Sequence, residues 1–124
     1  MLLFLYLLLL FPMHPSYSGR CRLYRKLLLN VQILENSVLH LLPDNELIIE
    51  DNVIIGPGCI IHGTTIGSNS VIESGSIVCD YSRLGKNTLL KSGSLVKQRS
   101  IFNDNQIIEG FPAKNVGENT EIQG

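Results

Sequence analysis

Two histidines stand where an imidazole ring could do chemistry: His40 in "SVLH" and His62 in "IIGPGCIIHGTTIG" (residues 54–67). An imidazole nitrogen can bind zinc or act as a general base near neutral pH. A third histidine, His14, lies in an N-terminal segment of different composition. A catalytic zinc site commonly uses three protein ligands and a water, so two histidines alone predict weak binding at most. Metal-free histidines and ordinary surface histidines are the alternatives.

The cysteines and the charge distribution exclude several other kinds of site. Cys21, Cys59 and Cys79 are widely spaced, without a CxxC or Cys-His motif, and predict reduced thiols rather than disulfides or a zinc knuckle. The 124-residue chain is 44% hydrophobic and 17% charged, with a net charge of −1, which fits one small ordered domain. All 11 acidic residues follow residue 31, so the main body offers no basic stripe for nucleic acid.

Residues 1–29 differ in composition from the rest of the chain. The apolar run "MLLFLYLLLLFPM" (residues 1–13) is shorter than the ~20 residues that a membrane-spanning helix needs. It has the length of a signal-peptide core, and "SYSG" would allow cleavage after Ser18, but the usual basic residues before the core are absent. We expect a cytoplasmic protein, with export or membrane association through residues 1–18 as the alternative. The segment could also replace the first turns of the domain or form a buried strand.

From residue 49 onward, a large apolar residue recurs at every sixth position, with a single step of five between Ile61 and Ile66. A period of six fits neither an α-helix nor a hairpin meander. A glycine or asparagine in every hexad would also destabilise a helix, by roughly 1 kcal/mol at each glycine. The repeated positions are Ile49, Ile55, Ile61, Ile66, Ile72, Val78, Leu84, Leu90, Val96, Phe102 and Ile108.

The fourth and fifth positions of the hexads are equally regular. The fourth is usually asparagine or glycine, which most readily adopt the left-handed conformation of a sharp corner. The fifth is usually small enough to lie inward. Tyr81 and Arg99 take corners without asparagine or glycine and are expected to project from one edge. The fourth positions are Asn52, Gly58, Asn69, Gly75, Asn87, Gly93 and Asn105, and the fifth are Cys59, Thr65, Ser70, Ser76, Ser82, Thr88, Ser94 and Ser100.

Corner residues repeat in the order asparagine, glycine, other, so that three hexads make one larger unit. This pattern predicts an all-β fold: a parallel β-helix of triangular cross-section whose stacked coils bury the aliphatic column. Upstream, Ile33 and Leu39 continue the spacing around Asn36, and "LLPDNEL" (41–47) interrupts it as a loop bulging from a corner. We expect about four to five coils in a domain of residues 30–118, followed by a short tail, 119–124.

The hexads, together with four further stretches, make the chain resemble the hexapeptide-transferase superfamily, and within it the γ-class carbonic anhydrases. The resemblance spans about 70% of the chain and implies a left-handed β-helix that assembles as a homo-trimer. The left hand comes from the resemblance alone, because parallel crossovers are right-handed in about 98% of cases. The four stretches are "SVLH" (37–40), "IIHGTTIG" (60–67), "IGSNSVIESGSIV" (66–78) and "GFPAKNVGE" (110–118).

In that family three histidines, two from one subunit and one from its neighbour, bind a zinc ion whose bound water becomes a hydroxide that attacks CO2. The resemblance assigns His40 as the first ligand and His62 as the last. The remaining ligand position is Pro57, which offers no donor to a metal. The family's glutamine–aspartate pair, which helps position the metal-bound water, falls at Leu34 and Glu35. Glu35 is therefore the candidate catalytic residue, beside an incomplete zinc site.

Three functions stay open at this point. The first is a carbonic-anhydrase-like enzyme acting on CO2 or bicarbonate through His40 and His62. The second is a non-catalytic structural subunit of a trimeric assembly. The third is an acyltransferase with His62 as general base on an acceptor hydroxyl or amine, although loops that would grip an acyl carrier are not recognisable. Cys59 is expected to be a buried thiol, with a role as substitute metal ligand as the alternative, and Cys79 is expected to face outward.

Overall fold

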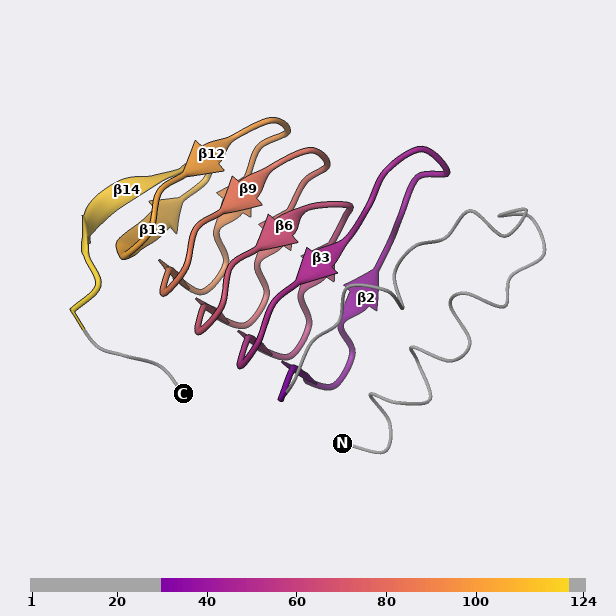
Figure 1. Ribbon diagram of the computed structural model, residues 1–124, viewed down its shortest axis with the longest axis horizontal. Helices are drawn as coiled ribbons and strands as arrows, with labels where there is room; N and C mark the ends of the chain where they lie inside the picture. Colours follow the sequence, from indigo (N-terminus) through magenta and orange to yellow (C-terminus); the bar gives the residue numbers. More distant parts are fainter. Residues whose placement is uncertain (1–29, 121–124) are drawn as a thin grey trace.

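The computed structural model describes residues 30–120, which form a left-handed parallel β-helix of stacked three-sided coils (Figure 1). This confirms the predicted fold class. Residues 1–29 and 121–124 lie outside the described part, so the predicted signal or membrane segment and most of the predicted tail fall there. The strands are β1 (Gln32–Ile33), β2 (Val38–Leu39), β3 (Ile48–Ile49), β4 (Ile54–Ile55), β5 (Ile60–Ile61), β6 (Thr65–Ile66), β7 (Val71–Ile72), β8 (Ile77–Val78), β9 (Arg83–Leu84), β10 (Leu89–Leu90), β11 (Leu95–Val96), β12 (Ile101–Phe102), β13 (Gln106–Gly110) and β14 (Ala113–Glu118).

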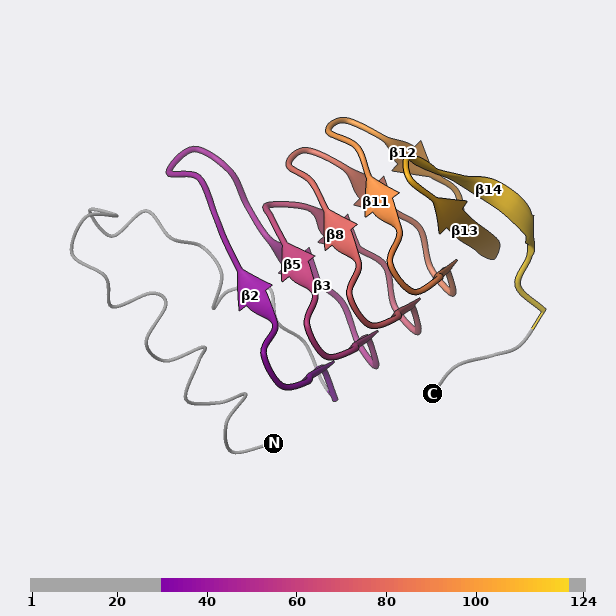
Figure 2. The same cartoon turned by 180° about the vertical axis from the view of Figure 1, so that it is seen from behind.

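Strands three apart in the chain lie side by side, so the coils have three flat faces. Face A consists of β3, β6, β9 and β12; face B of β1, β4, β7, β10, β13 and β14; and face C of β2, β5, β8 and β11 (Figure 2). The parallel register pairs equivalent hexad positions, as where Leu39 lies opposite Ile61 and Ile61 opposite Val78. Residues that occupy the same place in successive hexads are therefore stacked in columns.

The first position of each hexad points into the coils, as predicted. From Leu39 to Val96, each of these side chains is at most 1% exposed. Burying an aliphatic side chain of this size contributes roughly 1.5–3 kcal/mol, and the stacked column is therefore the main source of stability. Phe102, in the last coil, is only half-buried.

The predicted corners adopt the left-handed conformation. Asn52 has a φ of 61° and Gly58 one of 69°, and Tyr81 and Arg99 share this geometry with φ of 63° and 62°. The Arg99 guanidinium lies 4.8 Å from the centroid of the Tyr81 ring, so these two side chains stack along one edge. Neighbouring corner asparagines also donate to one another, from Asn30 to Asn52 to Asn69 and from Asn87 to Asn105.

Most fifth positions carry inward hydroxyl groups, with one correction to the prediction. Thr65 was predicted to be the inward residue of the short hexad, but Thr64 is, with 2% of its surface exposed. Thr65 is half-buried and begins β6. The hexad from Ile61 to Thr65 lacks a fourth-position corner residue, so every later position moves one residue toward the N-terminus.

The C-terminal end departs from the parallel pattern. β13 continues face B beside β10, and β14 returns antiparallel along it. Gly110, the last residue of β13, has a φ of 123°, and Pro112 lies in the short connection that reverses the chain. The hexad pattern could not predict this hairpin, because it specifies only stacking in one direction. Among residues 30–120 there is no helix long and apolar enough to cross a membrane.

Candidate functional site

Face C carries the sequence-predicted site residues at two opposite edges. His40 and His62 directly follow β2 and β5, whereas Glu35 and Pro57 lie in the corners that precede the same strands. The structure therefore brings the two histidines together and brings Glu35 and Pro57 together. Within one chain, a strand of face C separates the two pairs.

The two histidines are in direct contact. Their ring centroids are 5.4 Å apart and the ring planes cross at 80°, an edge-to-face arrangement. His40 is exposed and His62 is half-buried. Their backbone N–H groups donate to the carbonyls of Ile61 and Val78 in the next coil, which fixes the positions from which both rings project. Stacking of equivalent hexad positions thus places two imidazoles side by side.

The corner pair is held by the same stacking. The Gly58 N–H donates to the Glu35 carbonyl, and the Gly75 N–H donates to the Pro57 carbonyl, both at 3.0 Å. Glu35 is exposed and Pro57 is half-buried. Because these residues precede the strands that the histidines follow, neither can reach the histidine pair of its own chain. A role for Glu35 beside the histidines therefore requires a second copy of the chain.

A zinc ion requires more ligands than one chain supplies here. Among residues 30–120, no group of three histidine, cysteine, aspartate or glutamate side chains is placed to hold a metal ion. His40 and His62 offer two nitrogen ligands, and the third assigned position is the distant Pro57. His14 lies outside the described residues. The described chain therefore supplies two of the three nitrogen ligands of such a site and not a complete set.

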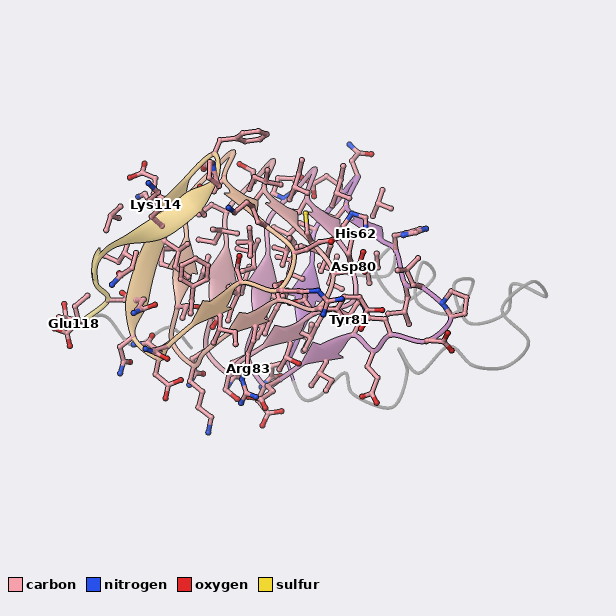
Figure 3. All side chains as sticks on the ribbon, turned by 90° about the horizontal axis from the view of Figure 1, so that it is seen from above. His62, Asp80, Tyr81, Arg83, Lys114 and Glu118 are labelled. Carbon is pink, nitrogen blue, oxygen red and sulfur yellow. The ribbon has the colours of Figure 1, made fainter. Side chains whose placement is uncertain are left out.

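A buried carboxylate lies behind His62, and sequence reasoning missed it. The Asp80 Oδ2 atom is 3.9 Å from the His62 Nδ1 atom, and Figure 3 shows the two residues in the same region. Asp80 Oδ1 accepts hydrogen bonds from Asn45 Nδ2 at 3.1 Å and from the Gly63 N–H at 3.2 Å. The shortened hexad and the loop over residues 41–47 were the available signals, because Gly63 and Asn45 belong to them.

The two described cysteines differ in their surroundings. Cys59 is buried, and its thiol donates to the Glu73 carbonyl at 3.2 Å. Burial raises the pKa of the Cys59 thiol, which suits the predicted structural role. Cys79 follows Val78 and is half-buried in the column of His62. Burial raises its pKa as well, and the negative charge of Asp80 adds to the effect.

Similarity to known proteins agrees with this architecture. A family described as bacterial transferase hexapeptide (six repeats) matches residues 47–80. Over 91 residues the chain is 46% identical to a carbonic anhydrase from Geobacillus kaustophilus, a match that covers 73% of this chain and 50% of that protein. This chain belongs to the hexapeptide-repeat family. The hexapeptide-repeat chain spans about half the length of this curated relative.

Solved structures of other hexapeptide-repeat proteins have a similar fold. A Bacillus cereus protein assigned as an acetyltransferase matches with a TM-score of 0.72 and 34% identity, over 73% of this chain and 53% of that one. A hexapeptide transferase family protein from Anaplasma phagocytophilum matches with a TM-score of 0.55 and 25% identity, over 77% of this chain and 68% of that one. The same scaffold therefore carries proteins assigned to two kinds of chemistry.

Proposed function

We propose that this protein is a γ-carbonic-anhydrase-like subunit that assembles as a homo-trimer and carries two of the three ligands of a zinc site. The observation that carries the proposal is the contact between His40 and His62, whose ring centroids are 5.4 Å apart on adjacent coils. The 46% identity to a carbonic anhydrase supports this branch of the family. His40 and His62 are the proposed metal ligands.

The outer surface of face C supports the trimer. Its strands present an aliphatic column of Val38, Ile60, Ile77 and Leu95, with Val38 49% and Ile60 38% exposed. An apolar column between two site edges is a natural contact surface between copies. Three copies with face C toward a common axis would bring the histidine edge of one copy beside the Glu35–Pro57 edge of the next.

The proposed arrangement limits zinc binding and catalysis at the boundary between two natural chains. A zinc ion bound there would lower the pKa of a bound water toward neutrality. His40 and His62 would each direct one ring nitrogen to the site, and Glu35 of the adjoining copy would supply a carboxylate that can accept a proton. Position 57 of that copy is proline, so each boundary offers one nitrogen ligand too few. We therefore expect weak zinc binding and little hydration of CO2 by the natural chain.

The test is Pro57→His, with Pro57→Ala as the matched control that removes proline without adding a ligand. We expect zinc near one ion per chain and measurable CO2 hydration in Pro57→His, and little of either in the control and in the natural protein. Metal analysis and stopped-flow hydration assays give the two readouts. Full zinc occupancy in the natural protein, or a folded Pro57→His protein without zinc, would contradict the proposal.

A second candidate is acyl transfer, favoured by the 34% identity to the Bacillus cereus protein assigned as an acetyltransferase. His62 would then act as a general base on an acceptor hydroxyl or amine. Calorimetric titration of the natural protein with acetyl-coenzyme A distinguishes the two. Saturable binding that His62→Ala leaves intact, together with acyl transfer that this variant loses, would favour the second candidate.

A further inference from the structure

We propose that Asp80 is a positioning residue that holds the neutral His62 ring with its proton on Nδ1, leaving the Nε2 lone pair available to a metal ion or a proton. The inference rests on the proposed function only in taking His62 as a metal ligand or general base. It identifies the residue that sets the tautomer and orientation of the His62 ring before any ligand binds. A carboxylate behind a histidine commonly fixes its tautomer and ring orientation at metal sites.

The burial of His62 supports this assignment. Its Nδ1 atom is buried and has no hydrogen-bond partner among the described residues, although 27% of the side chain is exposed. The exposed part of the ring therefore does not include Nδ1. The Asp80 side chain is 10% exposed, and its Oδ2 atom lies 3.9 Å from Nδ1. This separation exceeds hydrogen-bonding distance, and such contacts are often long before a ligand binds.

The hydrogen bonds of Asp80 leave the oxygen nearer His62 for this role. Both the Asn45 side-chain amide and the Gly63 N–H donate to Oδ1, and neither uses Oδ2. Asn45 is itself fixed, because its second amide proton is directed at the Gly63 carbonyl at 3.0 Å and its oxygen accepts from the Glu46 N–H at 2.8 Å. The carboxylate is thus held from one side only.

The loop between β2 and β3 supplies Asn45, one of the two donors that hold the Asp80 carboxylate. It extends farther from the coils than the other corners do (Figure 1), and it delivers Asn45 to the place where the five-residue hexad lacks a corner residue. A Cβ atom at Gly63 would overlap Asn45 Nδ2, so only glycine leaves room for the amide. The shortened hexad and the long loop together position Asp80.

The substitution Asp80→Asn separates positioning from a purely structural role. The asparagine oxygen can still accept from Asn45 and Gly63, so both hydrogen bonds that hold residue 80 are retained. The asparagine NH2 group must then face His62, and as a donor it favours an unprotonated Nδ1. A structural role for Asp80 would leave the His62 tautomer unchanged, whereas the positioning role predicts that the proton moves to Nε2.

The experiment is long-range ¹H–¹⁵N NMR of the histidine rings in metal-free full-length protein, at alkaline pH where imidazoles are neutral. We expect His62 as the Nδ1–H tautomer in the natural protein and mainly as the Nε2–H tautomer in Asp80→Asn. His40 serves as the internal reference. Asp104→Asn is the matched control, because Asp104 likewise accepts from a backbone N–H, that of Lys86 at 2.8 Å, but in a corner on an exposed surface.

Two results would overturn the inference: an Nε2–H tautomer of His62 in the natural protein, or an unchanged Nδ1–H tautomer in folded Asp80→Asn. Should Asp80→Asn not fold, Asp80→Ala removes the carboxylate without adding a donor and must raise the Nε2–H fraction; no rise would overturn the inference. In the Pro57→His background, Asp80→Asn should weaken zinc binding about 10–100-fold. Failure of Pro57→His to bind zinc would contradict the proposed function but leave the tautomer result intact.

Discussion

The Asn45 side-chain amide donates to the Gly63 carbonyl at 3.0 Å, joining the loop between β2 and β3 to the shortened hexad of the next coil. The Tyr81 N–H donates to the same carbonyl at 2.8 Å from the coil after that. A side chain thus closes a corner that other coils close with a left-handed backbone residue. The irregular coil is therefore a specific structure that depends on both residues.

Gly63→Ala should destabilise the protein by roughly 1–3 kcal/mol, because the added methyl group would overlap Asn45 and approach Leu41 in a packed site. Urea unfolding measures the loss. In the Asn45→Ala background the cost of Gly63→Ala should decrease, since the obstructing amide is gone and only the contact with Leu41 remains. Strictly additive losses in the double variant would show that the two residues are not coupled.

Gly75→Val and Gly93→Val should each destabilise the protein by roughly 1–3 kcal/mol, for a reason that differs from Gly63. Their φ values are 72° and 68°, and a Cβ at either position meets nothing within 4 Å. The cost is therefore backbone strain alone. Gly75→Asn is the matched control and should be nearly neutral, because asparagine occupies the equivalent corner at Asn69 and Asn87. Equal melting of the Val and natural proteins would contradict the left-handed corners.

The regular part of this fold could be predicted because each hexad position has a strict steric requirement. An inward position such as Ile72 accepts only a large apolar side chain, and a corner such as Gly75 strongly favours glycine or asparagine. The Thr65 prediction was wrong where the repeat loses one residue. The inward side chain there is Thr64, because a shortened hexad moves the register toward the N-terminus.

The candidate site could be predicted only in part, since Asn45, which holds the Asp80 carboxylate, lies outside the repeat. His40 and His62 follow equivalent strands, so the spacing alone brings them together. The Asp80 carboxylate lies near His62 and accepts a hydrogen bond from Asn45, which lies in a loop of irregular sequence. No periodic pattern specifies where such a loop docks, and its contacts became visible only in three dimensions.

Cys59 should make the stability of the protein fall at alkaline pH. Burial raises its pKa in the folded chain, so the folded state retains the thiol proton while the unfolded state loses it. The free energy of unfolding therefore decreases as pH rises through the ordinary thiol range, near 8.5. Urea unfolding at pH 7 and pH 9.5 measures this decrease.

Cys59→Ser is the matched variant for the pH dependence. Ser76 occupies the equivalent inward position, and its hydroxyl donates to the Lys91 carbonyl at 3.1 Å as the Cys59 thiol donates to Glu73. Removing the titrating thiol should reduce the loss of stability between the two pH values. An equal loss in Cys59→Ser would assign the alkaline effect to another group, with Cys79→Ser as the next variant to compare.

Ile60→Lys should prevent assembly of the proposed trimer and leave monomers, because it places a charge in the middle of the aliphatic column of face C. The side chain of Ile60 points outward and is 38% exposed in the single chain. Ile101→Lys is the matched control: Ile101 also points outward from a strand, on face A, and is 72% exposed. Sedimentation should give about three times the monomer mass for the natural protein and the control. A monomeric natural protein, or a trimeric Ile60→Lys protein, would contradict the proposed arrangement.

The last prediction concerns which copy supplies which ligand. Residue 57 precedes β5 and His62 follows it, so a histidine at position 57 can meet the histidine pair only of another copy. A chain carrying Pro57→His, His40→Ala and His62→Ala would offer the third ligand but no pair, and the natural chain offers a pair but no third ligand. Each should remain poor in zinc when purified alone.

Co-expressed with different affinity tags, the two chains should form mixed trimers. These trimers should bind zinc at each boundary where the histidine at position 57 of the triple variant meets the His40–His62 pair of the natural chain. Tandem purification followed by metal analysis should find zinc only in assemblies that contain both chains. As the control, the triple variant co-expressed with a natural chain lacking only His62 (His62→Ala) should not recover it. Zinc in the triple variant alone would show that residue 57 acts without the pair. Mixed trimers without zinc would show that the two edges of face C do not meet across the boundary.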